Sequence, residues 1–183
     1  MSGGHHESIN EILQKDTEDE SLRKYKEQLL GAAVKGVPKT DDPRRVVVET
    51  FGLKFPDGDH PDIIREVETP EKVAKLEHEP INIKEGVKYQ FVVTYRVQHD
   101  IVPALHFVNT IKKTMVTVDQ QNTMMGSYAP RVEPYTYKSQ PQYAPSGMLA
   151  RGSFKANTKF VDDDGNTHLE MNYNLVIKKD WTE

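Results

Sequence analysis

A β-hairpin near the C-terminus constrains the fold of this chain more than any other feature. Small and apolar side chains occupy every second position along 154–160 and again along 169–177, and the five residues Asp162-Asp163-Asp164-Gly165-Asn166 between them have the composition of a turn. Successive residues of a strand face opposite sides, so each arm has one buried face and one solvated face. The segment from Tyr89 to Val97 repeats the alternation. These segments therefore predict a sheet that must cover its apolar face with a second layer.

Other short segments complete an all-β pattern. Strands are expected at 46–48, 51–55, 63–67, 81–83, 87–98, 105–112 and 115–118. The stretch 56–80 is rich in turn residues, and 126–147 reads as a long loop rich in proline and tyrosine. Short strands, regular turns and few helices predict a β-sandwich over residues 46–183.

The N-terminal region has a different character. Capping-box spacing at Ser8–Glu11 and Thr17–Glu20 predicts two short helices, whose apolar stripes are too narrow to form a core. Residues 1–35 are therefore expected to form a flexible arm that orders as a helix-loop-helix on a partner, although a frayed tail stays open as an alternative. Residues 36–45, with Gly36, Pro38 and Pro43, are expected to be a linker.

Composition narrows the functional classes. The net charge of −4 argues against a nucleic-acid partner, and the absence of cysteine excludes disulfides, thiol nucleophiles and zinc-thiolate sites. No segment has the length of a membrane span, and we find no signal peptide or lipid-anchor motif. We expect a cytosolic protein that does not insert stably into membranes and is a monomer when free.

No catalytic or metal-binding pattern can be recognised. The run 162–166 resembles part of a calcium loop, but Phe160 stands where the first ligand belongs and no glutamate closes the loop. A solvated turn, or an acidic contact for a partner, fits better. The histidines have no metal-ligand spacing, and no catalytic triad is visible. We expect no cofactor, no metal and no enzymatic activity.

The methionines allow two interpretations. Met115, Met124, Met125, Met148 and Met171 all fall within the predicted sandwich. Because methionine is flexible and apolar, it commonly fills irregular space in a core. It would equally suit a cavity that opens between the sheets for a flexible lipid chain. The pattern alone does not separate the two.

Several longer motifs follow one another from about Ser8 to Trp181. They are Glu20-Ser21-Leu22-Arg23-Lys24-Tyr25-Lys26-Glu27, Leu29-Leu30-Gly31, Lys84-Glu85-Gly86-Val87, Gly126-Ser127-Tyr128, Pro130-Arg131, Gly147-Met148-Leu149-Ala150-Arg151-Gly152-Ser153, Phe160, Asp162-Asp163-Asp164, His168-Leu169, Asn174-Leu175 and Ile177-Lys178-Lys179-Asp180-Trp181. In this order they resemble the Rho GDP-dissociation inhibitors. The stretch 56–80 matches that family poorly.

The resemblance implies an immunoglobulin-like β-sandwich behind a regulatory arm. In the family, the arm folds on the switch regions of a Rho- or Rac-type GTPase, preferably GDP-bound, and slows GDP release. The sandwich takes up the geranylgeranyl group of the prenylated GTPase, which then leaves the membrane.

Particular positions carry this expectation. The resemblance implies GTPase contacts at Asp19, Ser21, Tyr25 and Asp164, and phosphorylation at Ser8 and Ser153. It implies prenyl contacts at Leu53, Ile81, Ile101, Met124, Met171 and Leu175. The chain departs from common members at several sites: Met171 and Tyr173 replace tryptophans, Thr123 replaces a pocket tyrosine, Ala129 replaces a glycine, and the acidic N-terminal tail is shortened to 1–7.

Two other functional classes remain as alternatives. A general carrier of prenyl or other lipid groups would share the sandwich and would not depend on the arm. An enzyme built on a β-sandwich would need a catalytic set, and the sequence contains none that can be recognised.

Overall fold

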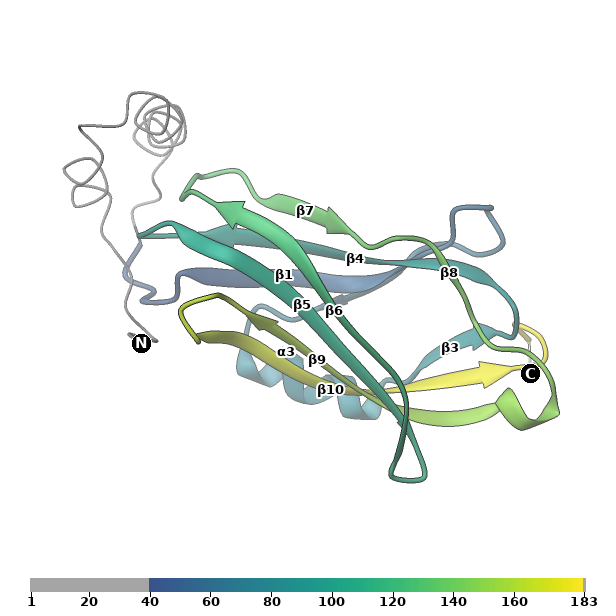
Figure 1. Cartoon of the computed structure of the whole chain (residues 1–183). Helices are drawn as coiled ribbons and strands as arrows, with labels where there is room; N and C mark the ends of the chain where they lie inside the picture. Colours follow the sequence, from purple (N-terminus) through teal and green to yellow (C-terminus); the bar gives the residue numbers. More distant parts are fainter. Residues whose placement is uncertain (1–39, 183) are drawn as a thin grey trace.

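Two sheets packed face to face make up the computed structural model, which describes residues 40–182 (Figure 1). The strands of the first sheet are β1 (Val46–Lys54), β2 (Ile63–Glu66), β4 (Lys88–Val97), β7 (Tyr135–Lys138) and β8 (Gln142–Tyr143). Those of the second are β3 (Ile81–Lys84), β5 (Val102–Lys113), β6 (Val116–Tyr128), β9 (Gly152–Val161) and β10 (Thr167–Lys178). Their order is β2-β1-β4-β7, with β8 also on β4, against β3-β10-β9-β5-β6. The expected all-β sandwich is confirmed.

The predicted hairpin is formed by β9 and β10. The two strands pair antiparallel, with Phe154 opposite Leu175 and Thr158 opposite Met171. Strand β3 lies parallel to β10, and β5 pairs with the other side of β9. The inner faces of both sheets supply one continuous core. Its largest side chains include the interlocking rings of Phe51, Phe91, Phe107, Phe160 and Tyr173.

A local irregularity joins two predicted segments into one strand. The sequence predicts separate strands at 46–48 and 51–55, whereas β1 runs unbroken through both with a register shift between Val48 and Thr50. The extra residue changes the phase of the alternation. Val48 and Phe51 therefore both belong to the buried core, although they are an odd number of residues apart.

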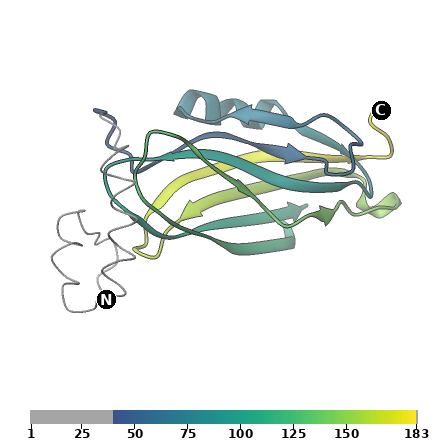
Figure 2. The same cartoon turned by 90° about the horizontal axis from the view of Figure 1, so that it is seen from above.

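A short helix replaces part of the predicted turn-rich stretch. Helix α3 (Pro70–Lys75) continues into the 3₁₀ turn η1 (Leu76–His78) and lies outside both sheets (Figure 2). The Thr69 hydroxyl accepts a hydrogen bond from the Lys72 N–H at 3.3 Å, and Pro70 occupies the start of the helix. Both are helix-start signals. Six residues are too few for a helical period to show in the sequence.

The predicted loop over 126–147 also contains strands. Strand β6 extends to Tyr128, β7 and β8 follow, and a second 3₁₀ turn, η2 (Met148–Ala150), precedes β9. Strand β6 lies at the edge of its sheet and is exposed along most of its length, so it has no clear alternation.

The two ends of the sandwich carry different features. At one end the chain enters at residue 40, and the β9–β10 turn lies close by, because Arg45 reaches Asp162. At the other end lie η2, the β5–β6 turn and the last described residues (Figure 1). No helix among residues 40–182 is long and apolar enough to cross a membrane.

A cavity between the sheets as the candidate functional site

A cavity of about 450 Å³ lies between the two sheets at the end that carries η2. This volume falls within the usual range for small-molecule sites. The lining residues come from strands of both sheets and from the segment before β9, and they are Ile83, Tyr89, Ile111, Lys113, Val118, Asp119, Gln142, Tyr143, Ala144, Pro145, Leu149, Ala150, Phe154, Leu175 and Ile177.

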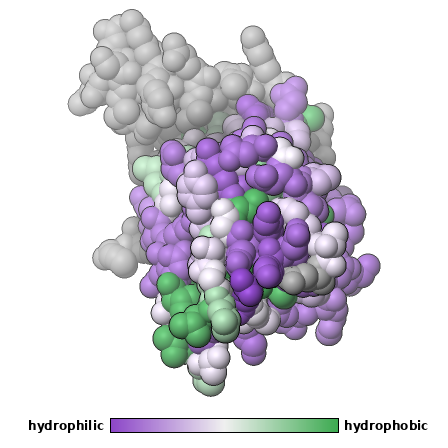
Figure 3. Space-filling model, turned by 90° about the vertical axis from the view of Figure 1, so that its right-hand side faces the viewer, coloured by the Kyte–Doolittle hydropathy of each residue, from purple (hydrophilic) through white to green (hydrophobic). Residues whose placement is uncertain are grey.

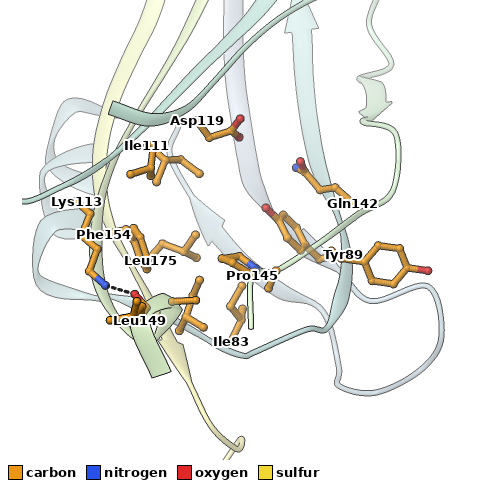
Figure 4. Close-up of a pocket in the computed structure, with 15 residues that line it drawn as sticks. Ile83, Tyr89, Ile111, Lys113, Asp119, Gln142, Pro145, Leu149, Phe154 and Leu175 are labelled. Atoms are coloured by element: carbon orange, nitrogen blue, oxygen red, sulfur yellow. Dashed lines mark hydrogen bonds between the residues drawn. The ribbon is translucent and has the colours of Figure 1, made fainter. Parts of the chain in front are cut away.

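The inner wall is apolar because strand alternation directs one side of each strand into the sandwich. Ile111, Phe154 and Leu175 point into the same space from β5, β9 and β10, and Ile83 closes it from β3 (Figure 4). Tyr143 and Val118 are exposed, and both line the cavity. They mark its mouth, where β8 and β6 come together.

A strap of residues 147–151 closes one side of the cavity. The Lys113 ammonium donates to the carbonyl oxygens of Leu149 at 2.7 Å and Arg151 at 3.2 Å, and it lies 5.0 Å from the Phe154 ring centroid. Arg151 forms a bidentate pair with the Glu85 carboxylate, with Nε–Oε2 at 2.8 Å and the second terminal nitrogen at 3.0 Å from Oε1. The strap is thus fixed to β5 on one side and to the β3–β4 turn on the other.

Few polar groups face the cavity. Burial, with a smaller contribution from the Asp119 charge, raises the pKa of Tyr89 to about 12, so its hydroxyl stays neutral at physiological pH. The Gln142 side-chain oxygen accepts a hydrogen bond from Gln121 at 2.7 Å. Two charged residues, Lys113 and Asp119, also line the cavity, and the Lys113 ammonium is bound to the carbonyl oxygens of the strap. The rest of the lining is mostly apolar, so the site suits a largely apolar ligand.

A buried polar cluster lies just behind the cavity. The next inward-facing residue after Leu175 on β10 is Tyr173, whose hydroxyl lies 3.0 Å from the Thr158 hydroxyl and 3.2 Å from the Asn109 side-chain oxygen. Thr158 also donates to that oxygen at 2.7 Å. All three side chains are buried, and burial raises the pKa of Tyr173 above its ordinary range. This hydrogen-bonded cluster lies behind the apolar walls.

The acidic β9–β10 turn is organised by one buried carboxylate. Asp162 Oδ1 accepts from the backbone N–H groups of Asp164 at 2.9 Å and Asn166 at 3.1 Å, and Oδ2 lies 2.7 Å from His168 Nε2 and 3.3 Å from Arg45. The Asp162 side chain is fully buried. Asp163 is exposed and Asp164 is half-buried. No group of three or more His, Asp or Glu residues that could hold a metal ion is found within 40–182.

The six predicted prenyl positions lie in different places. Leu175 lines the cavity. Leu53, Ile81 and Met171 are buried in the core between the sheets, and Ile81 pairs with Leu175. Ile101 lies just before β5, at the opposite end of the sandwich, and Met124 is exposed on β6. Their contact with a prenyl group stays a prediction.

The predicted GTPase-contact and phosphorylation positions are partly covered. Asp19, Ser21, Tyr25 and Ser8 lie outside the described residues, as does most of the predicted arm and linker. Asp164 lies in the acidic turn, and Ser153 is exposed on β9.

Five residues that line the cavity were not predicted from the sequence as site residues: Ile111, Lys113, Val118, Tyr143 and Phe154. For Phe154 the alternation was visible, but nothing in it marks which end of the sandwich opens. For the exposed residues there was no signal.

Three of the five methionines within residues 40–182 do not fill the core, and Met125 packs against it partly buried. Met171 is buried, whereas Met115, Met124 and Met148 are exposed. The core-filling interpretation therefore holds for Met171 and is wrong for these three.

Comparison with known proteins gives a consistent result. A family profile described as "RHO protein GDP dissociation inhibitor" matches residues 1–180. Rho GDP-dissociation inhibitor 1 of Arabidopsis thaliana is 42% identical over 175 residues, covering 95% of this chain and 70% of its own length. The Schizosaccharomyces pombe Rho GDP-dissociation inhibitor is 38% identical over 181 residues, covering 99% and 87%. Rho GDP-dissociation inhibitor 1 of Homo sapiens is 38% identical over 176 residues, covering 96% and 84%. The chain therefore belongs to the Rho GDP-dissociation inhibitor family, whose members are regulators and not enzymes.

Proposed function

We propose that this protein binds prenylated Rho- or Rac-type GTPases in the cytosol, slows their GDP release and removes them from membranes. The observation that carries this proposal is the apolar cavity between the sheets of a chain that belongs to this family. The geranylgeranyl group would occupy that cavity. The N-terminal arm would contact the switch regions of the GTPase.

The energetics of the lipid chain support the cavity as its site. Withdrawing a prenyl chain from a bilayer forfeits about 0.8 kcal/mol for each buried methylene group. A carrier in water must offer equally dry surroundings, because a chain left in solvent regains nothing. Ile111, Phe154 and Leu175 supply such walls.

The acidic end of the sandwich supports a second contact. Arg45, the last residue of the predicted linker, bonds to Asp162 in the turn that presents Asp163 and Asp164. An arm leaving residue 40 therefore starts beside this turn, and both could reach one GTPase body. Two modest contacts joined by a linker can gain a few orders of magnitude in apparent affinity.

Prenylation should dominate binding in a direct titration. We expect geranylgeranylated GDP-bound Rho-type GTPase to bind at least about 100-fold more tightly than the unprenylated protein, because only the former fills the cavity. Binding should be read as extraction from liposomes and as slowed GDP release. Equal affinity for the two forms would contradict the proposal.

The arm should control nucleotide release separately from lipid binding. Deleting residues 1–35 should abolish the slowing of GDP release while the geranylgeranyl group is still bound. Asp19→Ala should weaken both GTPase binding and GDP retention without unfolding the sandwich, which far-UV circular dichroism and Tm would check. A general lipid carrier would keep full cargo affinity after the deletion and would never have slowed GDP release.

A further inference from the structure

We propose that the end of the sandwich around the cavity mouth docks on the headgroup surface of an anionic lipid bilayer. This docking surface comprises the β5–β6 turn, with Met115 and Val116, and the strap with Met148. The inference rests on the proposed function, because it names the surface through which a membrane-embedded chain would enter.

Apolar side chains project into solvent at this end. Met115 is 93% exposed and Val116 64% exposed at the β5–β6 turn, and Met148 is 82% exposed on the strap. Figure 3, which looks onto this end, shows apolar side chains gathered in one area on a largely polar face. Lys113 links the two segments through its bond to the Leu149 carbonyl. Such a grouping is unusual on a protein that meets only water.

The β5–β6 turn holds its apolar tip in an unfavourable backbone. Lys113 pairs with Val116, so Thr114 and Met115 form a two-residue turn, with φ of 49° and 67°. Two-residue turns with both φ values positive favour Asn-Gly, and a β-branched threonine there is an outlier. Strain of this kind concentrates at functional positions. In this protein the strained turn places Met115 at the outermost point of the β5–β6 hairpin.

The charge of this end complements anionic lipid. The whole chain has a net charge of −4, yet the segments 84–88, 111–119, 144–155 and 175–180 together contain eight Lys or Arg residues and three Asp or Glu residues. The neighbouring β1–β2 turn, where His60 stacks on Trp181, adds Asp57, Asp59 and Asp62, so these segments keep an excess of two basic residues. Asp57 and Asp62 pair with Lys88 and Lys54. Lys84, Lys112, Lys155 and Lys179 are exposed, and none forms an ion pair with another described residue. Basic side chains around apolar tips are the pattern of proteins that rest on anionic membrane surfaces.

A bilayer fits this surface better than a protein does. The exposed apolar side chains project from two separate segments, the β5–β6 turn and the strap. Protein interfaces instead need close shape complementarity over a larger area. Acidic headgroups would be attracted, and the acyl region beneath them would accept the methionines.

Vesicle flotation of the full chain, without any GTPase, tests the surface. The variant combines Thr114→Asn, Met115→Gly and Met148→Ser, of which the first two suit the turn and should raise Tm. We expect wild type to bind phosphatidylcholine–phosphatidylserine vesicles and the variant to bind about tenfold less. Replacing phosphatidylserine with phosphatidylcholine should reduce wild-type binding. The control Val132→Ser with Ile64→Ser removes exposed apolar side chains elsewhere and should bind as wild type does.

Three results would overturn the proposal. They are undetectable wild-type binding to anionic vesicles, equal binding by the variant, and self-association of the wild type that the variant abolishes. The variant should bind a geranylgeranylated peptide in solution as wild type does, because none of its three sites lines the cavity. If wild type bound no such peptide, the proposed function would fail, and flotation would still decide on the docking surface.

Discussion

Replacing Asp162 with alanine should lower the free energy of unfolding by about 3–5 kcal/mol, since it breaks a buried ion pair and leaves its partners without an acceptor. The side chain is fully buried and takes hydrogen bonds from the turn backbone, His168 and Arg45. Arg45 is itself only 9% exposed, so its charge would stay largely buried and unpaired. Thermal denaturation should show Tm falling by roughly 10 °C.

The neighbouring Asp163→Ala serves as the matched control. Its carboxylate is exposed and lies 3.4 Å from His106, a contact that contributes little to stability. We expect a change within about 0.5 kcal/mol. Equal losses from the two substitutions would show that Asp162 does not organise the turn.

The Asp162 contribution should also depend on pH. Burial alone would raise the pKa of this carboxyl, but hydrogen bonds from the Asn166 backbone, His168 and the Asn166 side chain together lower it below 3.8. Its contribution is therefore present above the unfolded pKa and is lost as pH falls through the folded value. The stability gap between wild type and Asp162→Ala should close only below about pH 3.8.

His168 adds a second acid-sensitive contribution. Burial lowers its pKa, although the Asp162 carboxylate opposes the shift. The unfolded chain then binds a proton more readily than the folded one, so this stability is present above about pH 6.5 and declines below it. Denaturant unfolding of His168→Gln across pH 5–8 should show a flatter profile than wild type. An unchanged slope would argue against a buried neutral imidazole.

Val118→Glu should reduce affinity for a geranylgeranylated peptide about 100-fold while leaving the fold intact. Val118 lines the cavity but is 52% exposed in the free protein, so a carboxylate there stays solvated and Tm should hardly change. A bound lipid would cover that carboxylate, and burying an unpaired charge costs several kcal/mol. Asp119 next to it adds like-charge repulsion.

Two controls separate the cavity from general charge effects. Val132→Glu adds the same charge at a similarly exposed position outside the lining, and should leave peptide affinity unchanged. Val118→Leu keeps the wall apolar and should bind within a few-fold of wild type. Full affinity in Val118→Glu would mean that the lipid does not pass this side of the mouth.

The sandwich could be predicted because its strands alternate strictly where they face the core. Residues 154–160 and 169–177 show this period of two and pair with each other as β9 and β10, and 89–97 shows it in β4 of the other sheet. Only the first residues of β6 fall within a predicted strand, 115–118, because the rest of this exposed edge strand does not alternate. Helix α3 was not predicted, because a capping threonine and a proline were its only local signals in the sequence.

The site was harder to predict than the fold. Alternation identifies inward-facing residues such as Phe154 and Leu175, but a cavity exists only where two sheets and a strap leave space between them. That space depends on long-range contacts such as the Arg151–Glu85 pair, which joins positions 66 residues apart. The exposure of Met115, Met124 and Met148 could not be predicted either, because the neighbouring sequence does not distinguish a methionine in a core from one on a hairpin tip.

The position of the acidic turn and the cavity at opposite ends of the sandwich sets a length requirement on the cargo. Strand β9 has 10 residues between these ends, which at about 3.3 Å per residue corresponds to roughly 30 Å. A GTPase body resting on Asp163 and Asp164 would need a C-terminal tail of about nine or more extended residues to deliver its lipid. Tail length, independent of tail sequence, would then sort the GTPases that this protein can carry.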